Sequence, residues 1–237
     1  MWKIMFFPGN RTCTITKMRT IYCISGLGAD ERAFSNLKIE GHKLHVIQWL
    51  QPRPNETLKH YAKRMRVAIT EENPILMGLS FGGMVSIEIA KQIHVEKIII
   101  ISSIKSSTEL PNWMKTVAKL KLNKILPVGS SKLTEPLQNH FLGISTAEEK
   151  QMVAVSRKKA NKIYTNWAVN QAINWKSDWH HPEIYHIHGD NDKMFPIKKI
   201  KPTYTLKDAG HFMIMNRADE VSAFINSILQ ESAGQAG

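Results

Sequence analysis

The feature that most constrains this chain is a serine set between glycines at the point where an apolar run gives way to a helical pattern. Residues 74–77 form the apolar run, which is typical of a central parallel strand. Gly78, Ser80 and Gly82 follow it in the pattern G-x-S-x-G. A sharp strand-to-helix turn of this kind holds the serine in a strained conformation, with its hydroxyl free at the strand's carboxyl end. A Cβ at either glycine would collide with the neighbouring strand or helix.

The rest of the chain alternates between strand and helix patterns. After the turn, apolar residues recur at helical spacing at Met84, Ile87, Ile89 and Ala90. Strands are expected where β-branched and aromatic residues gather, at residues 20–25, 44–50, 95–101, 183–188 and 203–206. Helices are expected at residues 30–37, 57–70 and 218–229. This alternation predicts βαβ units and an α/β fold with a mostly parallel central sheet.

The alternation stops between residues 106 and 176. No strand-like run occurs there, and amphipathic helices are expected at residues 111–122, 131–141, 147–161 and 163–173. We therefore divide the chain into a core of residues 1–105 and 177–237 and a helical insertion of residues 106–176. Before the first convincing strand, residues 3–7 and 12–17 are expected to pair as a short hairpin.

A serine hydroxyl becomes a good nucleophile only when an oriented base removes its proton. Two later segments supply titratable groups, each after an expected strand: residues 188–192 read His-Gly-Asp-Asn-Asp, and residues 209–212 read Ala-Gly-His-Phe. Because parallel strands end at the same edge of a sheet, both segments should lie beside Ser80.

The three segments, in this order, resemble those of the α/β-hydrolase fold, a family of serine hydrolases. The resemblance implies that residues 106–176 form a lid, that Ser80 is the nucleophile and that His211 is the base. The family's acid follows the pattern H-G-x-x-D, with a proline beyond it, which selects Asp192 rather than Asp190. Asp190 is then expected to bond its own turn.

An oxyanion hole needs two backbone N–H groups aimed at the developing negative charge. The resemblance assigns them to Phe81, which follows the nucleophile, and to Leu27, in the turn after the first core strand. Related enzymes often have His-Gly-x in that turn, whereas this chain has Ser25-Gly26-Leu27, which leaves the packing of the loop open. The chain has no HGGG run, so the lipase branch built on that run is disfavoured.

Composition restricts the partners. The net charge is +12, but the lysines are spread along the chain without an aromatic-interleaved basic motif, so we expect no nucleic-acid partner. Much of the excess positive charge comes from lysines in the insertion, which suggests a preference for anionic substrates. The sequence shows no membrane-spanning run and no signal peptide, and the two cysteines suit a reducing compartment, so we expect a cytoplasmic protein without a membrane partner.

We expect no metal and no cofactor. Four histidines, at positions 180, 181, 186 and 188, suggest a metal site as the alternative, but no cysteine or carboxylate completes the ligand set. We expect His188 to border the turn of the acid instead. Trp113, Trp167 and Trp175 are expected to pack lid helices rather than line a pocket.

Three functions stay open on the sequence. The first is a serine hydrolase that cleaves a small or medium carboxylic ester or thioester through an acyl-serine intermediate. The second keeps the same fold and triad for carbon–carbon cleavage, lyase or lactone chemistry. The third is a ligand binder without catalysis, which a complete triad disfavours.

Overall fold

The computed structural model describes residues 2–4, 15–122, 134–159 and 161–231. Its centre is a six-stranded sheet in the order β4-β3-β5-β6-β7-β8, and every neighbouring pair is parallel. The strands are β3 (Arg19–Ile24), β4 (His42–Val46), β5 (Ile75–Leu79), β6 (Lys97–Ile101), β7 (Ile184–Gly189) and β8 (Tyr204–Leu206). The expected α/β class with a mostly parallel sheet is confirmed.

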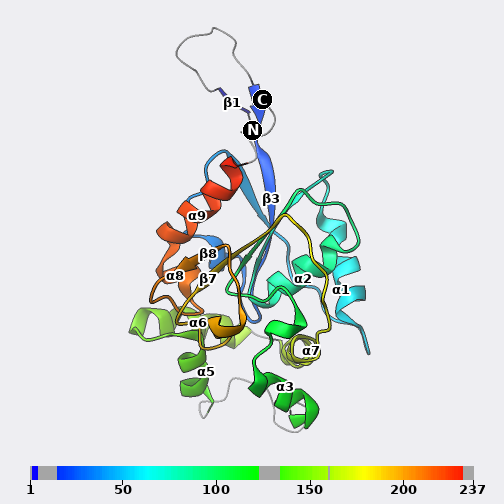
Figure 1. The fold of residues 1–237 in the computed structure, drawn as a ribbon, viewed down its shortest axis with the longest axis vertical. Coiled ribbons are helices and arrows are strands. Elements are labelled where there is room, and N and C mark those ends of the chain that lie inside the picture. The colour runs from blue at the N-terminus through cyan, green and yellow to red at the C-terminus, as the bar shows by residue number, and fades with distance from the viewer. Residues whose placement is uncertain (1, 5–14, 123–133, 160, 232–237) are drawn as a thin grey trace.

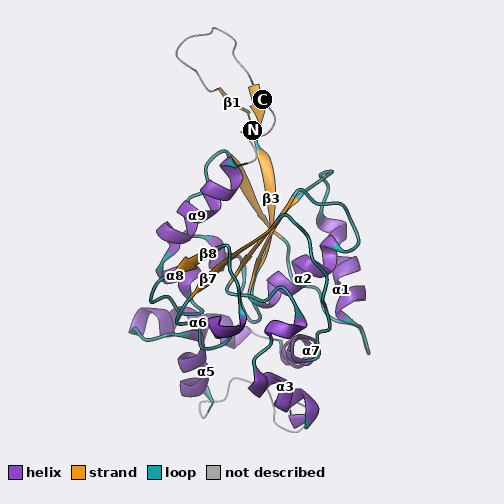
Figure 2. Ribbon diagram, in the orientation of Figure 1, coloured by secondary structure: helices purple, strands orange, loops and turns teal. Residues whose placement is uncertain are grey.

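Helices cover both faces of this sheet (Figures 1 and 2). Helices α1 (Leu58–Met65) and α2 (Phe81–Ala90) pack on one face, and α8 (Met213–Asn216) and α9 (Ala218–Gln230) pack on the other. Side chains alternate along β3, so that Tyr22 and Ile24 enter the first core whereas Ile21 and Cys23 enter the second. Because α2 lies against both the sheet and α1, all of its residues are buried.

The described residues between β6 and β7 form helices and no strand. They are the 3-10 turn η3 (Ser107–Glu109) and helices α3 (Asn112–Lys119), α5 (Glu135–Leu142), α6 (Ala147–Lys159) and α7 (Lys162–Ile173). These helices gather at the carboxyl ends of the strands (Figure 1). Each overlaps an expected helix, although the start of the one expected at 131–141 lies outside the described residues.

Several expected elements differ from the observed ones in length. The strand expected at 44–50 is β4, which ends at Val46. The N–H of Ile47 still donates to the Cys23 carbonyl at 2.9 Å, and the chain then leaves the sheet. Both backbone polar groups of Leu50 bond the Tyr61 hydroxyl instead, at 2.9 Å and 2.7 Å. The helix expected at 30–37 is the short 3-10 turn η1 (Glu31–Phe34), capped by Asp30 as expected. The helix expected at 57–70 is α1 followed by η2 (Arg66–Ala68).

An N-terminal strand pair and one short 3-10 turn lie outside these layers. At the N-terminus, β1 (Trp2–Ile4) pairs antiparallel with β2 (Ile15–Lys17), and the residues of the expected hairpin between them lie outside the described part. The 3-10 turn η4 (Ile197–Lys199) lies between β7 and β8. None of the helices in the described ranges combines the length and apolar character that crossing a bilayer requires.

Candidate active site

Ser80 lies between β5 and α2 in a backbone conformation that only a few residues adopt. Its φ is 51° and its ψ is −119°. Such a conformation costs about 1–3 kcal/mol in a residue with a side chain, and it persists only where the surroundings enforce it. Here the Ser80 N–H donates to the carbonyl of Ile101 at 2.9 Å, and the hydroxyl of Ser103 donates to the Ser80 carbonyl at 2.7 Å. The last residue of β6 and the segment just after it therefore bond both backbone polar groups of the strained serine.

The glycines around Ser80 are required by close backbone contacts. A Cβ on Gly78 would lie 2.5 Å from backbone atoms of Gly82 and Gly83. A Cβ on Gly82 would lie 2.1 Å from the carbonyl oxygen of Ile24 and 2.3 Å from that of Ser25. These distances are far inside van der Waals contact, so the turn can close, and α2 can lie against the end of β3, only without side chains at these positions.

His211 and Asp192 complete a hydrogen-bonded chain with Ser80. The Oγ of Ser80 lies 2.9 Å from Nε2 of His211, and Nδ1 of His211 lies 2.8 Å from Oδ2 of Asp192. Asp192 follows β7 and His211 follows β8, so the expected convergence at the carboxyl edge of the sheet is observed. His211 and Asp192 are buried, whereas Ser80 is partly exposed. An imidazole placed in this way can take the Ser80 proton while the carboxylate steadies the resulting charge.

Backbone donors hold the Asp192 carboxylate on its other side. Its Oδ1 accepts hydrogen bonds from the N–H groups of Met194 at 2.8 Å and Phe195 at 2.9 Å. Burial opposes ionisation of this carboxyl, but His211, His188 and the Phe195 N–H together hold its pKa below the usual range. Asp192 therefore stays ionised at neutral pH.

Asp190 bonds elsewhere. Its Oδ1 accepts from the backbone N–H of Asp208 at 2.6 Å, which ties the Asp192 loop to the loop that leads to His211. The expected bond within its own turn is replaced by this one between loops. Gly189 allows the same approach, because a Cβ there would lie 2.2 Å from the carbonyl oxygen of Ala209.

Two fully buried histidines lie behind the acid. Nε2 of His188 is 2.8 Å from the carbonyl oxygen of Phe195, and because a carbonyl only accepts, this nitrogen has the proton. Its Nδ1 is 3.2 Å from Nε2 of His186. Burial lowers the pKa of His188 and lowers that of His186 well below its ordinary value. His188 thus borders the Asp192 turn as expected, and within the described residues no three His, Cys, Asp or Glu side chains are placed so that they could hold a metal ion.

The two expected oxyanion donors belong to segments that adjoin Ser80. The Phe81 N–H opens the first turn of α2. Leu27 lies in a four-residue turn that the Ala29 N–H closes on the Gly26 carbonyl at 3.0 Å, with Gly28 at a φ of 75°. A Cβ on Gly26 would be 3.4 Å from the Ser80 Cβ, so this turn contacts the serine. Neither N–H has a hydrogen-bond partner within the described part of the chain.

No protein-family model matches the sequence, and no curated protein matches it. Solved structures do match. An esterase from Thermogutta terrifontis aligns over 90% of both chains at 15% identity with a TM-score of 0.66. An epoxide hydrolase from Bacillus megaterium covers 90% of this chain and 94% of its own at 13% identity and a TM-score of 0.64. A meta-cleavage product hydrolase from Pseudomonas fluorescens covers 91% and 92% at 14% identity and a TM-score of 0.65.

The chain has the α/β-hydrolase fold. The three proteins are named for three different reactions, so the fold leaves the reaction to be argued from the site.

The helices between β6 and β7 contact residues next to Ser80 and His211. Trp167 of α7 packs edge-on against Phe81, with ring centroids 6.1 Å apart. At the end of α5, Gly143 approaches Gly210, where a Cβ would lie 3.5 Å from the Gly143 Cα. Of the tryptophans expected to pack lid helices, only Trp113 does so within the described residues, on Phe141 of α5, and it is 40% exposed. Trp167 packs on Phe81 of α2, and Trp175 is buried and donates to Glu88 of α2 at 2.9 Å, so both contact the core instead.

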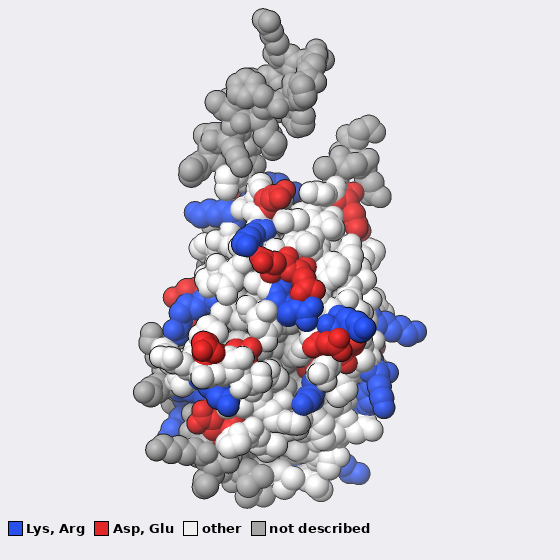
Figure 3. All heavy atoms as spheres, turned by 90° about the vertical axis from the view of Figure 1, so that its left-hand side faces the viewer, with Lys and Arg blue, Asp and Glu red and all other residues white. Residues whose placement is uncertain are grey.

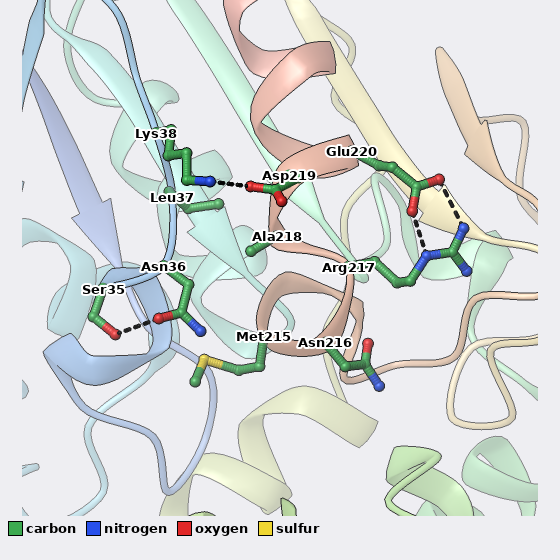
Figure 4. Close-up of a pocket in the computed structure, with 10 residues that line it drawn as sticks. All are labelled: Ser35, Asn36, Leu37, Lys38, Met215, Asn216, Arg217, Ala218, Asp219 and Glu220. Atoms are coloured by element: carbon green, nitrogen blue, oxygen red, sulfur yellow. Dashed lines mark hydrogen bonds and ion pairs between the residues drawn. The ribbon is translucent and has the colours of Figure 1, made fainter.

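Other hollows and charges lie away from the triad. A hollow of about 600 Å³ is lined by residues 35–38 and 215–220 (Figure 4). Its charged groups already form the ion pairs Lys38–Asp219 and Arg217–Glu220, and neither Ser80 nor His211 lines it. On the face of the molecule in Figure 3, basic and acidic side chains are interspersed rather than gathered by sign. The triad region is therefore the candidate site.

Proposed function

We propose that this protein is a serine hydrolase that cleaves a small or medium carboxylic ester or thioester through an acyl-serine intermediate. The observation that supports this most strongly is the continuous chain from Ser80 Oγ to His211 to Asp192, at 2.9 Å and 2.8 Å. A hydrogen-bonded serine, histidine and carboxylate on a strained strand-to-helix turn is the arrangement that activates a hydroxyl for acyl transfer.

The proposed reaction has two halves. Ser80 Oγ attacks the carbonyl carbon of the ester as His211 Nε2 takes the hydroxyl proton, and the N–H groups of Leu27 and Phe81 bind the resulting oxyanion. The tetrahedral intermediate expels the alcohol or thiol, which takes the proton from His211. Water then attacks the acyl-serine with His211 as base, and the acid is released as the proton returns to Ser80.

The helical segment of residues 106–176 is proposed as a lid over this site. Its contacts with Phe81 and Gly210 support that role, since both neighbour triad residues. The lid exposes Lys115, Lys119, Lys121 and Lys162, whereas Arg157 already pairs with Glu135 at 3.1 Å. The exposed lysines support a preference for anionic esters.

A second candidate uses the same triad to cleave a carbon–carbon bond. The similar fold of the meta-cleavage product hydrolase favours testing it. One experiment separates the two: purified protein is assayed with p-nitrophenyl esters of increasing acyl length and with a meta-cleavage product. We expect ester turnover that Ser80→Ala abolishes with little change in melting temperature. Turnover retained by a folded Ser80→Ala variant would overturn the assignment.

A further inference from the structure

The oxyanion hole is formed by two segments that are far apart in sequence, and their N–H groups must be positioned to within a few tenths of an ångström. Its donors must lie 2.7–3.1 Å from the oxyanion, and small displacements weaken them. The Phe81 N–H is fixed by α2, but the Leu27 N–H lies in a loop that lacks the histidine often found in related enzymes. A side chain that touches both segments would therefore control the geometry of the hole.

We infer that Trp49 is this positioning residue, and that it acts on the loop through Ser25. The inference rests on the proposed function, because it concerns the oxyanion hole of that reaction. Trp49 lies in the connection after β4, outside both segments that supply the donors.

On the loop side, the contact is a short relay of hydrogen bonds. Trp49 Nε1 donates to the Ser25 hydroxyl at 2.9 Å, and that hydroxyl donates to the carbonyl of Ala29 at 2.8 Å. Ser25 is only 1% exposed, so water is a poor substitute for either partner. Ser25 directly precedes the turn that contains Leu27, and Ala29 is the last residue of that turn, so the relay joins its two ends.

On the nucleophile side, the contact is a ring stack. The indole of Trp49 lies over the ring of Phe81, with centroids 5.9 Å apart and planes at 25°. Phe81 is buried, so its side chain has little freedom to move independently of α2. The rigid indole of Trp49 thus contacts both Ser25, which precedes the Gly26-Leu27 turn, and Phe81, which follows Ser80.

Trp49 itself is held firmly enough to serve as a spacer. The Tyr61 hydroxyl bonds both backbone polar groups of the adjacent Leu50. The ring of Tyr164, from α7, packs on the indole with centroids 5.1 Å apart. The indole is therefore fixed by α1 and by the proposed lid.

The test compares Trp49→Phe, Ser25→Ala and the double variant with wild type. Phenylalanine keeps an aromatic ring over Phe81 but removes the indole donor, and alanine removes the hydroxyl that links Trp49 to Ala29. Trp113→Phe is the matched control, because Trp113 is 40% exposed and packs on Phe141 of the lid. Each purified protein is measured for melting temperature, kcat and KM on one ester, and inhibition by a trifluoromethyl ketone, whose bound oxyanion mimics the transition state.

We expect each single variant to lose about tenfold in kcat with KM within about twofold, since a displaced donor costs less than the 10²–10³ of a deleted one. Inhibitor affinity should fall in parallel with kcat/KM. The kcat of the double variant should be no lower than that of the less active single variant, because both substitutions break the same relay of hydrogen bonds. Trp113→Phe should match wild type.

An unchanged kcat in the folded single variants would overturn the inference, and so would losses that multiply in the double variant. A raised KM with unchanged kcat would also overturn it, because Trp49 would then line the substrate pocket instead of positioning the donor. Should Trp49→Phe fail to fold, Ser25→Ala alone decides. Failure of the proposed function looks different, because wild type itself would then neither turn over esters nor bind the ketone.

Discussion

Replacing Asp192 with asparagine should disable His211 without disturbing the loop that holds it. The Oδ1 of Asp192 accepts from the N–H groups of Met194 and Phe195, and an amide oxygen can keep both bonds. The amide NH₂ must then face His211 Nδ1, where the carboxylate Oδ2 now accepts at 2.8 Å. Because a donor faces Nδ1, that nitrogen loses its proton, Nε2 keeps one, and His211 can no longer accept the proton of Ser80.

The magnitude follows from this tautomer change. The same substitution in a serine protease lowers kcat about 10⁴-fold, which corresponds to about 5 kcal/mol of transition-state stabilisation. We expect a loss of that order here, with KM little changed. Asp190→Asn is the matched control, since Asp190 accepts from the Asp208 N–H and an amide oxygen can do the same. It should keep kcat within about threefold.

The assay is steady-state turnover of a p-nitrophenyl ester, with folded fractions matched by circular dichroism. A folded Asp192→Asn variant within about tenfold of wild type would refute the argument, as the tautomer change predicts a far larger loss. An Asp190→Asn variant that loses more activity than Asp192→Asn would show that Asp190, rather than Asp192, orients His211.

Three further predictions concern the scaffold and the lid. Gly82→Ala should lower the free energy of unfolding, measured in urea, by about 3 kcal/mol, because its Cβ would lie 2.1 Å from the Ile24 carbonyl oxygen. Gly26→Ala, whose Cβ would have its nearest contact at 3.4 Å, should lower it by less than about 1 kcal/mol. Equal losses in the two variants would contradict the packing argument. Burial lowers the pKa of His186 and His188 in the folded protein, so their neutral forms cost no stability above the unfolded-state pKa of about 6.5, and the free energy of unfolding declines as pH falls below that value. His186→Leu should make this decline with pH less steep. An unchanged pH dependence of the free energy of unfolding would contradict the prediction. Added salt should lower kcat/KM for a carboxylate-bearing ester several-fold more than for a neutral one, and equal salt sensitivity would remove the suggested preference for anionic esters.

Much of the fold could be predicted from local patterns. The apolar runs that form β3, β5, β6 and β7 enter cores on both faces of the sheet, and such strands have a strong sequence signal. The strand expected at 44–50 was too long, because its last residues are apolar for another reason: they turn away from the sheet and pack against Tyr61 and α7. Periodicity cannot separate these two causes.

The candidate site shows the same limit. Ser80, Asp192 and His211 occur in motifs whose spacing reflects a turn geometry, and the structure brings the three side chains together. Ser25 departs from the His-Gly-x pattern and Trp49 belongs to no motif, and their contact joins segments 24 residues apart through side chains alone. The hydrogen bond from the Asp208 N–H to the Asp190 carboxylate is also a contact between loops. A single sequence has no local signal for such contacts, because they depend on how the loops fold over the sheet.

The central claim is that Ser80 is the nucleophile, and covalent labelling tests it most directly. The protein is incubated with a fluorophosphonate, and the adduct is located by peptide mass spectrometry. We predict one adduct, on Ser80, that forms in wild type, is absent from Ser80→Ala and forms orders of magnitude more slowly in Asp192→Asn. An esterase-active wild-type protein that takes no label on Ser80, or takes it on another residue, would contradict the claim.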